Sequence, residues 1–472
     1  MALNYKALAM TKKEAILNDL KELIAIDSSE DLAHKSEAYP VGPGAAKAMQ
    51  KFLSFGQRDG FSTKNVSNYA GRIDFGPENA EKRLGVIGHV DVVPAGNGWQ
   101  TPPFEMILRD GKIYGRGSSD DKGPILAAYY GLLLLKESGF TPKKKIDFII
   151  GTNEENDWID MTYYLKHEPK PDFVFSPDAE FPIINGEKGI VTLHLDFDRE
   201  IQKNDPSQIH LLQFKAGIAE NVTPHKAEAM ISVPIDQVEK QTADFQAFLE
   251  KNHLTGTCRQ TGQELHLEVI GQGAHASVPE VGRNAATFLA RFLDRLDFKG
   301  RDHAYLHFIS EIEHEDFDGE KLGIAHQDHL MGRLSSAPSL FFYEADGKAY
   351  VLDNIRYPQG TDPEKMVTQI SAKFGQILTP SHGNVEVPHY VPGDDPIVKT
   401  LLNVYAQQTG LPAHETVIGG GTYGRLFKHG VAFGAQPENA PMVMHQANEY
   451  MAVDDLLSAI SIYAQAIYEL TK

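Results

Sequence analysis

Two adjacent glutamates, Glu154 and Glu155, follow a largely apolar run at residues 146–150 in the segment GTNEEND. Two neighbouring carboxylates at the end of a buried strand repel each other, and both are costly to remove from water. A nearby divalent cation would offset both effects and keep the second carboxylate ionised. The pair therefore indicates that one glutamate binds a metal ion while the other faces a substrate and carries protons.

Three further groups of ionisable side chains also follow predicted strands or a glycine-rich turn. They are His89 with Asp91, Asp120 with Asp121, and Asp178. Taken alone, each group is more typical of a surface hydrogen bond, a helix cap or a turn. In open α/β sheets, however, ligands bind beyond the carboxyl ends of the strands, and carboxylates with imidazoles suit zinc or manganese. Four such groups in one domain therefore predict a metal site at one edge of a sheet.

Apolar segments that alternate with helix-like segments predict the sheet that would position these side chains. Strands are expected at 84–88, 145–150 and 173–175, and an apolar helix at 122–138. Strands separated by helices form mostly parallel sheets that are covered on both faces. Near the N-terminus, Thr11 and Glu14 have the spacing of a capping box that would open a further helix.

Residues 187–384 have a different pattern. Segments such as IVTLHLDF and ELHLEVIG alternate apolar and polar residues, as half-exposed antiparallel strands do. Helix-like stretches at 286–296 and 362–378 lie among them. We therefore expect an α/β domain with a mixed, mostly parallel sheet and helices on both faces, interrupted by an inserted α+β domain. The α/β domain would comprise residues 1–186 and 385–472, and the inserted domain residues 187–384.

The composition excludes several classes of function. The chain has 472 residues, which favours two domains, and its net charge of −19 argues against binding nucleic acid or an anionic membrane surface. Its one cysteine, Cys258, excludes an internal disulfide and a thiolate metal cluster. The first twenty residues lack the apolar core of a secretion signal, and no apolar run is long enough to span a bilayer. We therefore expect a cytoplasmic protein.

Five motifs, taken in order, resemble those of the dinuclear-metal peptidase family that includes aminoacylase, acetylornithine deacetylase, succinyl-diaminopimelate desuccinylase, carboxypeptidase G and carnosinase. The motifs are GHVDVVPAGNGW, GRGSSDDKGP, GTNEEND, SPDAEFP and MHQANEY. The resemblance extends over essentially the whole chain, and the large insertion is most similar to that of the bacterial dipeptidases in the family. It implies a metallodipeptidase that cleaves Xaa-Yaa dipeptides, carnosine-like β-Ala-His among them, with an α/β catalytic domain and an inserted lid domain.

The resemblance also implies two divalent ions, with Zn²⁺ as the first expectation and Mn²⁺ or Co²⁺ as alternatives. The implied metal ligands are His89, Asp120, Glu155, Asp178 and His445. Asp120 would bridge the two ions, because the family motif places the bridging acid two residues before a lysine, here Lys122. Asp121 is the alternative. Glu449, in the last motif, would support His445.

Further roles are implied around the substrate. Glu154 would be the general base, and Asp91 would fix the tautomer of His89. His275, in GQGAHASVPEVGRNAA, would lie over the scissile carbonyl as part of the lid. The terminal carboxylate of the substrate would be held by Asn221, Arg356, Gly420 and Gly421. From the residues alone, His275 would more often be structural, and Arg356 could equally form a salt bridge between domains.

Two other functions remain open at this point. The same metal site could remove an acyl group from an N-acyl-amino acid, as a deacetylase or desuccinylase does, and the metal motifs do not separate the two. A non-catalytic binding module would have lost its base or a ligand, whereas every proposed group is present. The enlarged lid implies a monomer that binds small peptides, without nucleic-acid or membrane partners.

Overall fold

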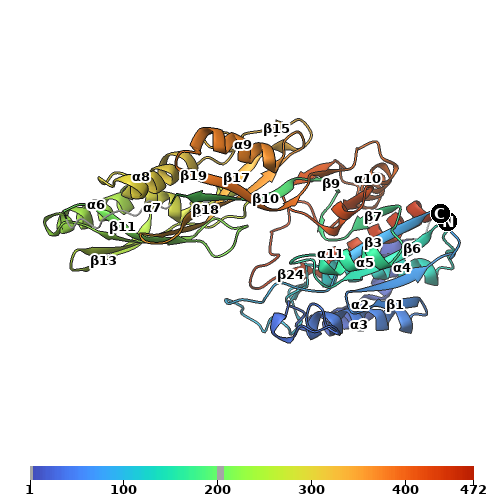
Figure 1. The fold of residues 1–472 in the computed structure, drawn as a ribbon. Helices are drawn as coiled ribbons and strands as arrows, with labels where there is room; N and C mark the ends of the chain where they lie inside the picture. Colours follow the sequence, from blue (N-terminus) through green and yellow to red (C-terminus); the bar gives the residue numbers. More distant parts are fainter. Residues whose placement is uncertain (1–3, 199–206) are drawn as a thin grey trace. The chain divides into compact units, whose positions relative to one another are not determined.

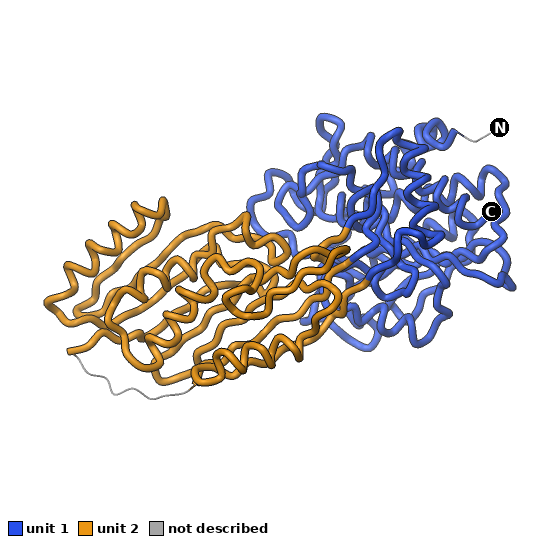
Figure 2. The backbone as a smooth tube through the Cα atoms, turned by 90° about the horizontal axis from the view of Figure 1, so that it is seen from above, with its two compact units in different colours: residues 1–186, 390–416, 421–472 blue, residues 187–389, 417–420 orange. Residues whose placement is uncertain are grey.

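The computed structural model describes residues 4–198 and 207–472, which form two compact units (Figures 1 and 2). Unit 1 consists of the described residues of 1–186 together with 390–416 and 421–472. Unit 2 consists of the described residues of 187–389 together with 417–420. The chain thus interrupts unit 1 to build unit 2 and then returns. No helix among the described residues is both long and apolar enough to cross a membrane.

Unit 1 is built on a mixed sheet in which the strands follow the order β1-β2-β6-β3-β7-β22-β9. The four strands β6, β3, β7 and β22 run parallel, whereas β1, β2 and β9 pair antiparallel toward the edges. The strands are β1 (Ser62–Val66), β2 (Ala70–Phe75), β3 (Arg83–His89), β6 (Lys145–Gly151), β7 (Phe173–Ser176), β9 (Ile184–Glu187) and β22 (Gly430–Ala432), and the shorter β20 (His389–Tyr390) and β21 (Thr416–Ile418) belong to the same sheet.

Helices cover both faces of this sheet, as the sequence predicts. Side chains alternate along each strand, so Val86 and Phe148 enter one core cluster while Ile87 and Ile149 enter another. Strands buried on both faces read as continuous apolar runs, which is why the sequence identifies β3 and β6 directly. The helices are α1 (Tyr5–Thr11), α2 (Lys13–Ile24), α3 (Pro43–Arg58), α4 (Lys122–Glu137), α5 (Ile159–His167), α10 (Pro396–Thr409) and α11 (Val453–Thr471), with short 3₁₀ turns η1 (Leu32–His34) and η5 (Tyr423–Leu426).

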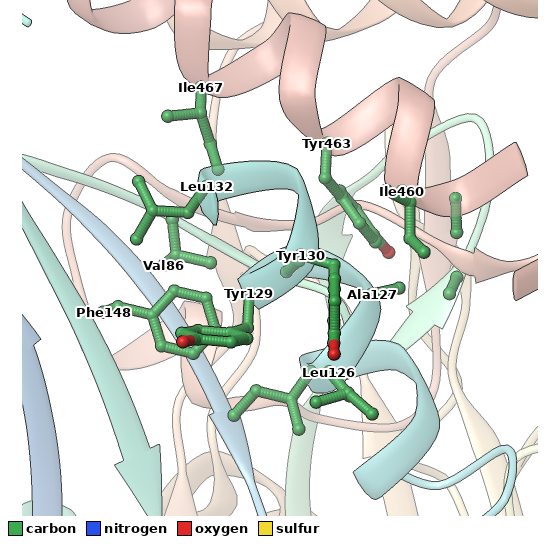
Figure 3. Packing of buried hydrophobic residues seen from close by; sticks show 14 of the residues in the cluster. Val86, Leu126, Ala127, Tyr129, Tyr130, Leu132, Phe148, Ile460, Tyr463 and Ile467 are labelled. Carbon is green, nitrogen blue, oxygen red and sulfur yellow. The ribbon is translucent and has the colours of Figure 1, made fainter. Parts of the chain in front are cut away.

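The close packing of α4 against α11 forms the centre of the larger core cluster (Figure 3). The ring of Tyr129 packs edge-on against Phe148 of β6, with 6.0 Å between ring centroids. Gly131 lets the two helices approach each other, because a Cβ atom there would lie 2.8 Å from the backbone nitrogen of Ala464. Helix α4 begins directly after Asp121, so this packing also fixes the start of the segment that carries Asp120.

Unit 2 is the expected α+β layer. Its sheet has the order β13-β14-β12-β11-β17-β18-β10-β19, and each of these pairings is antiparallel. Helices lie along one face of the sheet, as Figure 1 shows for α6, α7, α8 and α9. The strands are β10 (Gly189–Phe197), β11 (His210–Ala216), β12 (Lys226–Ser232), β13 (Thr255–Thr261), β14 (Glu264–Ile270), β17 (Ser335–Glu344), β18 (Ala349–Tyr357) and β19 (Leu378–Glu386). The helices are α6 (Val238–Lys251), α7 (Ala285–Leu293), α8 (Gly300–His307), the π-helical η4 (Phe308–Glu313) and α9 (Pro363–Phe374).

A pair of buried carboxyl groups lies between η4 and β18 in unit 2. Both carboxyl oxygens of Glu313 lack a hydrogen-bond partner among the described residues, and the side chain of Asp353 accepts a hydrogen bond from Ser336 Oγ at 2.6 Å. Burial raises the pKa of Asp353 to about 7. Burial, together with the negative charges of Asp353 and Asp316, raises the pKa of Glu313 well above its usual range, and Lys321 opposes that shift. This pair is therefore a pH-sensitive element of the core of unit 2.

Candidate metal centre

The four groups of ionisable residues predicted from the sequence meet at the carboxyl ends of the parallel strands of unit 1. Strands β3, β6 and β7 end at His89, Gly151 and Ser176, and they lie side by side in parallel register. Parallel strands end at the same edge of a sheet, so the segments that follow them share one region. A glycine-rich turn brings Asp120 to the same region, and the loop before β24 (Tyr450–Ala452) brings His445.

One set of candidate ligands is centred on His89. Its Nε2 atom lies 3.2 Å from Asp120 Oδ1 and 3.6 Å from Asp178 Oδ2. The potential ligand atoms of His89, Glu154 and Asp178 also lie within 4.8 Å of one another. An imidazole nitrogen facing several carboxylate oxygens in a buried position is a donor set that suits a borderline divalent ion.

A second set lies next to the first and shares Asp120 with it. His445 Nε2 lies 2.9 Å from Asp120 Oδ2 and 3.0 Å from Glu155 Oε2. The potential ligand atoms of His89, Asp120 and Glu155 also lie within 4.8 Å of one another. Asp120 thus directs one carboxylate oxygen toward each imidazole, which is the arrangement that a bridge between two ions requires.

Electrostatics shows how strongly this cluster favours added positive charge. Burial raises the pKa of Asp178 to about 6 and the pKa of Glu155 to about 7, and neighbouring carboxylates contribute to both shifts. Burial alone would lower the pKa of His445, but its hydrogen bonds with Asp120 and Glu155 raise it to about 11. Desolvation, again with neighbouring carboxylates, raises the pKa of Glu154 well above its usual range. The raised pKa values of these acids show that the cluster lacks compensating positive charge, so the donor set fits two divalent ions.

Asp91 contacts the Nδ1 side of His89, opposite the nitrogen that faces the candidate ligands. His89 Nδ1 lies 3.0 Å from the carbonyl oxygen of Asp91 and 3.2 Å from its Oδ1 atom. Both neighbours are acceptors, so Nδ1 carries a hydrogen, and Nε2 is the nitrogen that faces the candidate ligands and could bind an ion. The Asp91 carboxylate also accepts a hydrogen bond from the backbone N–H of Glu155 at 3.1 Å. One side chain therefore links the loops after β3 and β6.

Asp120 and Asp121 have different positions although they are adjacent. The Asp121 carboxylate lies behind β3, where Oδ2 accepts a hydrogen bond from the backbone N–H of His89 at 3.0 Å. Its side chain is fully buried, and its pKa is raised by burial and by the charge of Asp178. Asp120, by contrast, lies between the two imidazoles. This geometry favours Asp120 over Asp121 as a ligand.

Glu449 and Arg116 support the turn before Asp120, a role that the sequence did not predict for them. Glu449, expected to support His445, binds the turn that precedes Asp120 instead. Its Oε1 accepts hydrogen bonds from the backbone N–H groups of Ser119 at 2.8 Å and Asp120 at 3.2 Å. Its Oε2 accepts hydrogen bonds from Arg116 Nη1 at 2.7 Å and from the N–H of Gly117 at 3.2 Å. The sequence holds no local signal for these bonds, which join segments more than 300 residues apart.

Asp160 is a second supporting acid that the sequence analysis missed. Its carboxylate accepts hydrogen bonds from the backbone N–H groups of Thr152 at 2.7 Å and Asn153 at 3.0 Å, directly before Glu154. The hydroxyl of Tyr423, from η5, donates to the same carboxylate. Asp160 and Tyr423 therefore hold the loop that carries Glu154 and Glu155.

The residues proposed to hold the substrate lie together in unit 2, except for Gly421. His275 is exposed, and its Nδ1 lies 2.7 Å from Ser277 Oγ, a residue to which the sequence gave no role. The carbonyl of Asn221 accepts a hydrogen bond from the N–H of Ala276 at 2.9 Å, beside His275. Gly421 belongs to unit 1, where it lies next to Arg425.

Arg356 is buried at the end of β18. Its Nε donates to Asn354 Oδ1 and its Nη1 donates to the carbonyl of Gly419, both at 2.9 Å. Gly419 precedes Gly420, and it packs so closely on Ser277 that a Cβ atom would come within 2.6 Å of the serine Cβ. Arg356, His275, Asn221 and Gly420 therefore lie in one patch of unit 2. The contacts of Gly419, Ser277 and Ala276 join them.

The chain is similar to known proteins in sequence and in fold. Residues 85–469 match the model of peptidase family M20/M25/M40. Beta-Ala-Xaa dipeptidase of Lactobacillus delbrueckii subsp. lactis is 61% identical over 473 residues, covering 100% of this chain and 99% of that protein. The crystal structure of human carnosine dipeptidase 1 has a similar fold, with a TM-score of 0.59, 15% identity and coverage of 99% and 98% of the two chains. That of aminoacylhistidine dipeptidase from Vibrio alginolyticus has a TM-score of 0.56, 14% identity and coverage of 97% and 96%. The chain therefore belongs to peptidase family M20/M25/M40.

Proposed function

We propose that this chain is a metal-dependent dipeptidase that hydrolyses Xaa-Yaa dipeptides, including dipeptides that begin with β-alanine. The observation that carries the proposal is the full-length identity of 61% to Beta-Ala-Xaa dipeptidase. It is supported by the gathering of two imidazoles and several carboxylates at the strand ends of unit 1. The alternative is a deacylase of N-acyl-amino acids with the same metal site.

Two divalent ions would be held by five side chains. His89, Asp178 and one oxygen of Asp120 would bind the first ion, and His445, Glu155 and the other oxygen of Asp120 would bind the second. Neutral imidazoles with carboxylates suit Zn²⁺ first, and Mn²⁺ or Co²⁺ as alternatives. When bound, such ions polarise a carbonyl and lower the pKa of water.

Glu154 would act as the general base. It lies beside His89 and Asp178, whereas His445 contacts Asp120 and Glu155. It would accept a proton from the attacking water and later donate that proton to the departing amine. Asp91 would keep the hydrogen of His89 on Nδ1 throughout, so that the imidazole stays oriented.

Unit 2 would supply the groups that hold the substrate, apart from Gly421, which belongs to unit 1. His275 would donate a hydrogen bond to the oxygen on which negative charge develops, and Ser277 would orient its ring. Arg356, already fixed by Asn354 and Gly419, would pair with the terminal carboxylate of the dipeptide together with Asn221 and the N–H groups of Gly420 and Gly421. A binding group for that carboxylate explains why the peptide bond next to a free carboxyl terminus would be cleaved.

We also propose that the protein acts in the cytoplasm and is a monomer. Size-exclusion chromatography with light scattering can check the oligomeric state.

The test is hydrolysis of a matched panel by one metal-loaded preparation, with and without chelator. The panel contains Ala-Leu, β-Ala-His, a tripeptide, N-acetyl-leucine and N-succinyl-leucine. We expect cleavage of both dipeptides, loss of that cleavage with chelator, and its recovery with Zn²⁺, Mn²⁺ or Co²⁺. Preferential cleavage of the acyl amino acids would replace the dipeptidase proposal with the deacylase alternative, and metal-independent cleavage would refute the role of the ions.

A further inference from the structure

A second group of potential metal ligands lies in unit 2, apart from the centre described above. The potential ligand atoms of Asp294, His303 and His307 lie within 4.8 Å of one another. Asp294 directly follows α7, and the two histidines lie four residues apart on α8, which places them on one face of that helix. Their rings are nearly parallel, with centroids 5.1 Å apart and an angle of 12° between planes.

The position of Asp294 calls for a positive partner. It is the C-cap residue of α7, where the carbonyl end of the helix carries partial negative charge and disfavours a carboxylate. One oxygen lies 3.1 Å from His307 Nδ1. The other, Oδ1, is buried and has no hydrogen-bond partner among the residues that the structure describes.

The chemistry of the three donors selects the class of ion. Two imidazoles with one carboxylate suit borderline transition metals, and a set of two histidines and one acid is an established zinc-binding combination. Ions such as Mg²⁺ and Ca²⁺ prefer oxygen ligands and would gain little from the imidazoles. Both histidines are solvent-exposed, so water can complete the coordination.

We propose that Asp294, His303 and His307 form a third divalent transition-metal site, for Zn²⁺, Ni²⁺ or Cu²⁺, which links the end of α7 to α8. The site does not depend on the proposed dipeptidase function, because none of its residues belongs to the centre in unit 1. An ion there would compensate the negative charge of Asp294 and join two helices that pack on the sheet of unit 2.

The test counts the ions bound per chain. Metal-free wild type, His303→Ala and a control variant, His329→Ala, which removes another exposed histidine of unit 2, are dialysed against Zn²⁺ or Ni²⁺ and analysed by atomic emission. We expect wild type and His329→Ala to bind one more ion per chain than His303→Ala. Equal stoichiometry in wild type and His303→Ala would overturn the proposal, whatever number of ions the centre in unit 1 binds.

A second variant guards against a folding defect in the first. Asp294→Asn keeps the size of the side chain and removes its charge, and circular dichroism checks that each variant is folded. The untagged proteins are then compared on immobilised Ni²⁺. Wild type and His329→Ala should elute at a higher imidazole concentration than His303→Ala and Asp294→Asn. Elution of all four proteins at the same concentration would refute the site.

Discussion

Replacing Glu449 with glutamine is expected to loosen the turn that carries Asp120. The side chain of Glu449 is fully buried, and its two oxygens have separate donors. Arg116 Nη1 and the N–H of Gly117 donate to one oxygen, and the N–H groups of Ser119 and Asp120 donate to the other. Glutamine has one oxygen and one NH₂ group that only donates. In either orientation the NH₂ group faces donors, so two of these hydrogen bonds are replaced by repulsive contacts.

The size of the effect follows from the charges that remain. Hydrogen bonds to a charged group contribute about 1.5–3 kcal/mol each. Removing one charge of a buried ion pair costs about 3–5 kcal/mol, because the remaining charge stays buried without compensation. Arg116 would be such a charge, since its side chain is only 1% exposed. We therefore expect Glu449→Gln to lower the free energy of unfolding by about 3–5 kcal/mol. If about 1.4 kcal/mol of this loss falls on the position of Asp120, metal affinity decreases tenfold.

Two assays separate these effects. Guanidinium unfolding of the metal-free proteins measures stability, and dipeptide hydrolysis at increasing Zn²⁺ measures the metal requirement. Glu438→Gln is the matched control, because Glu438 lies in the same segment but its side chain is 39% exposed and its partner, His414, is 3.7 Å away. The control should change neither quantity measurably. If Glu449→Gln resembled the control in both assays, the reasoning that this carboxylate holds the turn would be refuted.

Three further variants test other parts of the structure. Glu154→Gln should reduce dipeptide turnover by at least about 100-fold with the metal content unchanged, since it removes only the proposed base; substantial remaining turnover would contradict that role. Because the pKa of Asp353 is raised to about 7, the folded state binds more protons than the unfolded state above pH 4, so this acid makes stability fall as pH rises toward 7. Glu313→Gln removes the neighbouring charge, so its melting temperature relative to wild type should increase between pH 5 and pH 8, whereas a constant difference would disprove the coupling. Gly131→Ala should lower the free energy of unfolding by about 1–3 kcal/mol, because its Cβ would meet the backbone of α11; an increase, as for an ordinary helical glycine, would show that the helices can separate.

The elements that hold the ligands could be predicted because each has a local signal. The strands β3 and β6 are continuous apolar runs, and α4 is an apolar helix that starts directly after the pair Asp120–Asp121. The α/β fold with an inserted α+β layer is confirmed, and so is the family resemblance drawn from the motifs. The order of strands in the sheet is not a local property. The rule that parallel strands end at one edge was nevertheless sufficient to predict that the acids meet.

The capping box at Thr11 is a prediction that proved wrong. Helix α1 extends through Thr11, whose hydroxyl donates to the carbonyl of Leu8 at 2.6 Å, and α2 begins after Lys12 without a side-chain cap. The motif has the spacing of a cap but lies inside a pair of consecutive helices, where the carbonyl of the preceding turn competes for the hydroxyl. Whether such a motif caps a helix therefore depends on the element that precedes it.

The supporting acids could not be found in this way, and the reason lies in what their oxygens bind. Glu449 and Asp160 accept hydrogen bonds from backbone N–H groups, and a backbone N–H is present at almost every position of a sequence. Candidate ligands such as Asp120 instead face imidazoles, which are rare enough to stand out. The pair Asp120–Asp121 shows that two adjacent, identical side chains can take one of these positions each. The number of acids in a motif therefore indicates that a charged site exists, whereas the partner of each oxygen separates an acid that faces the metal centre from one that holds the loop in place.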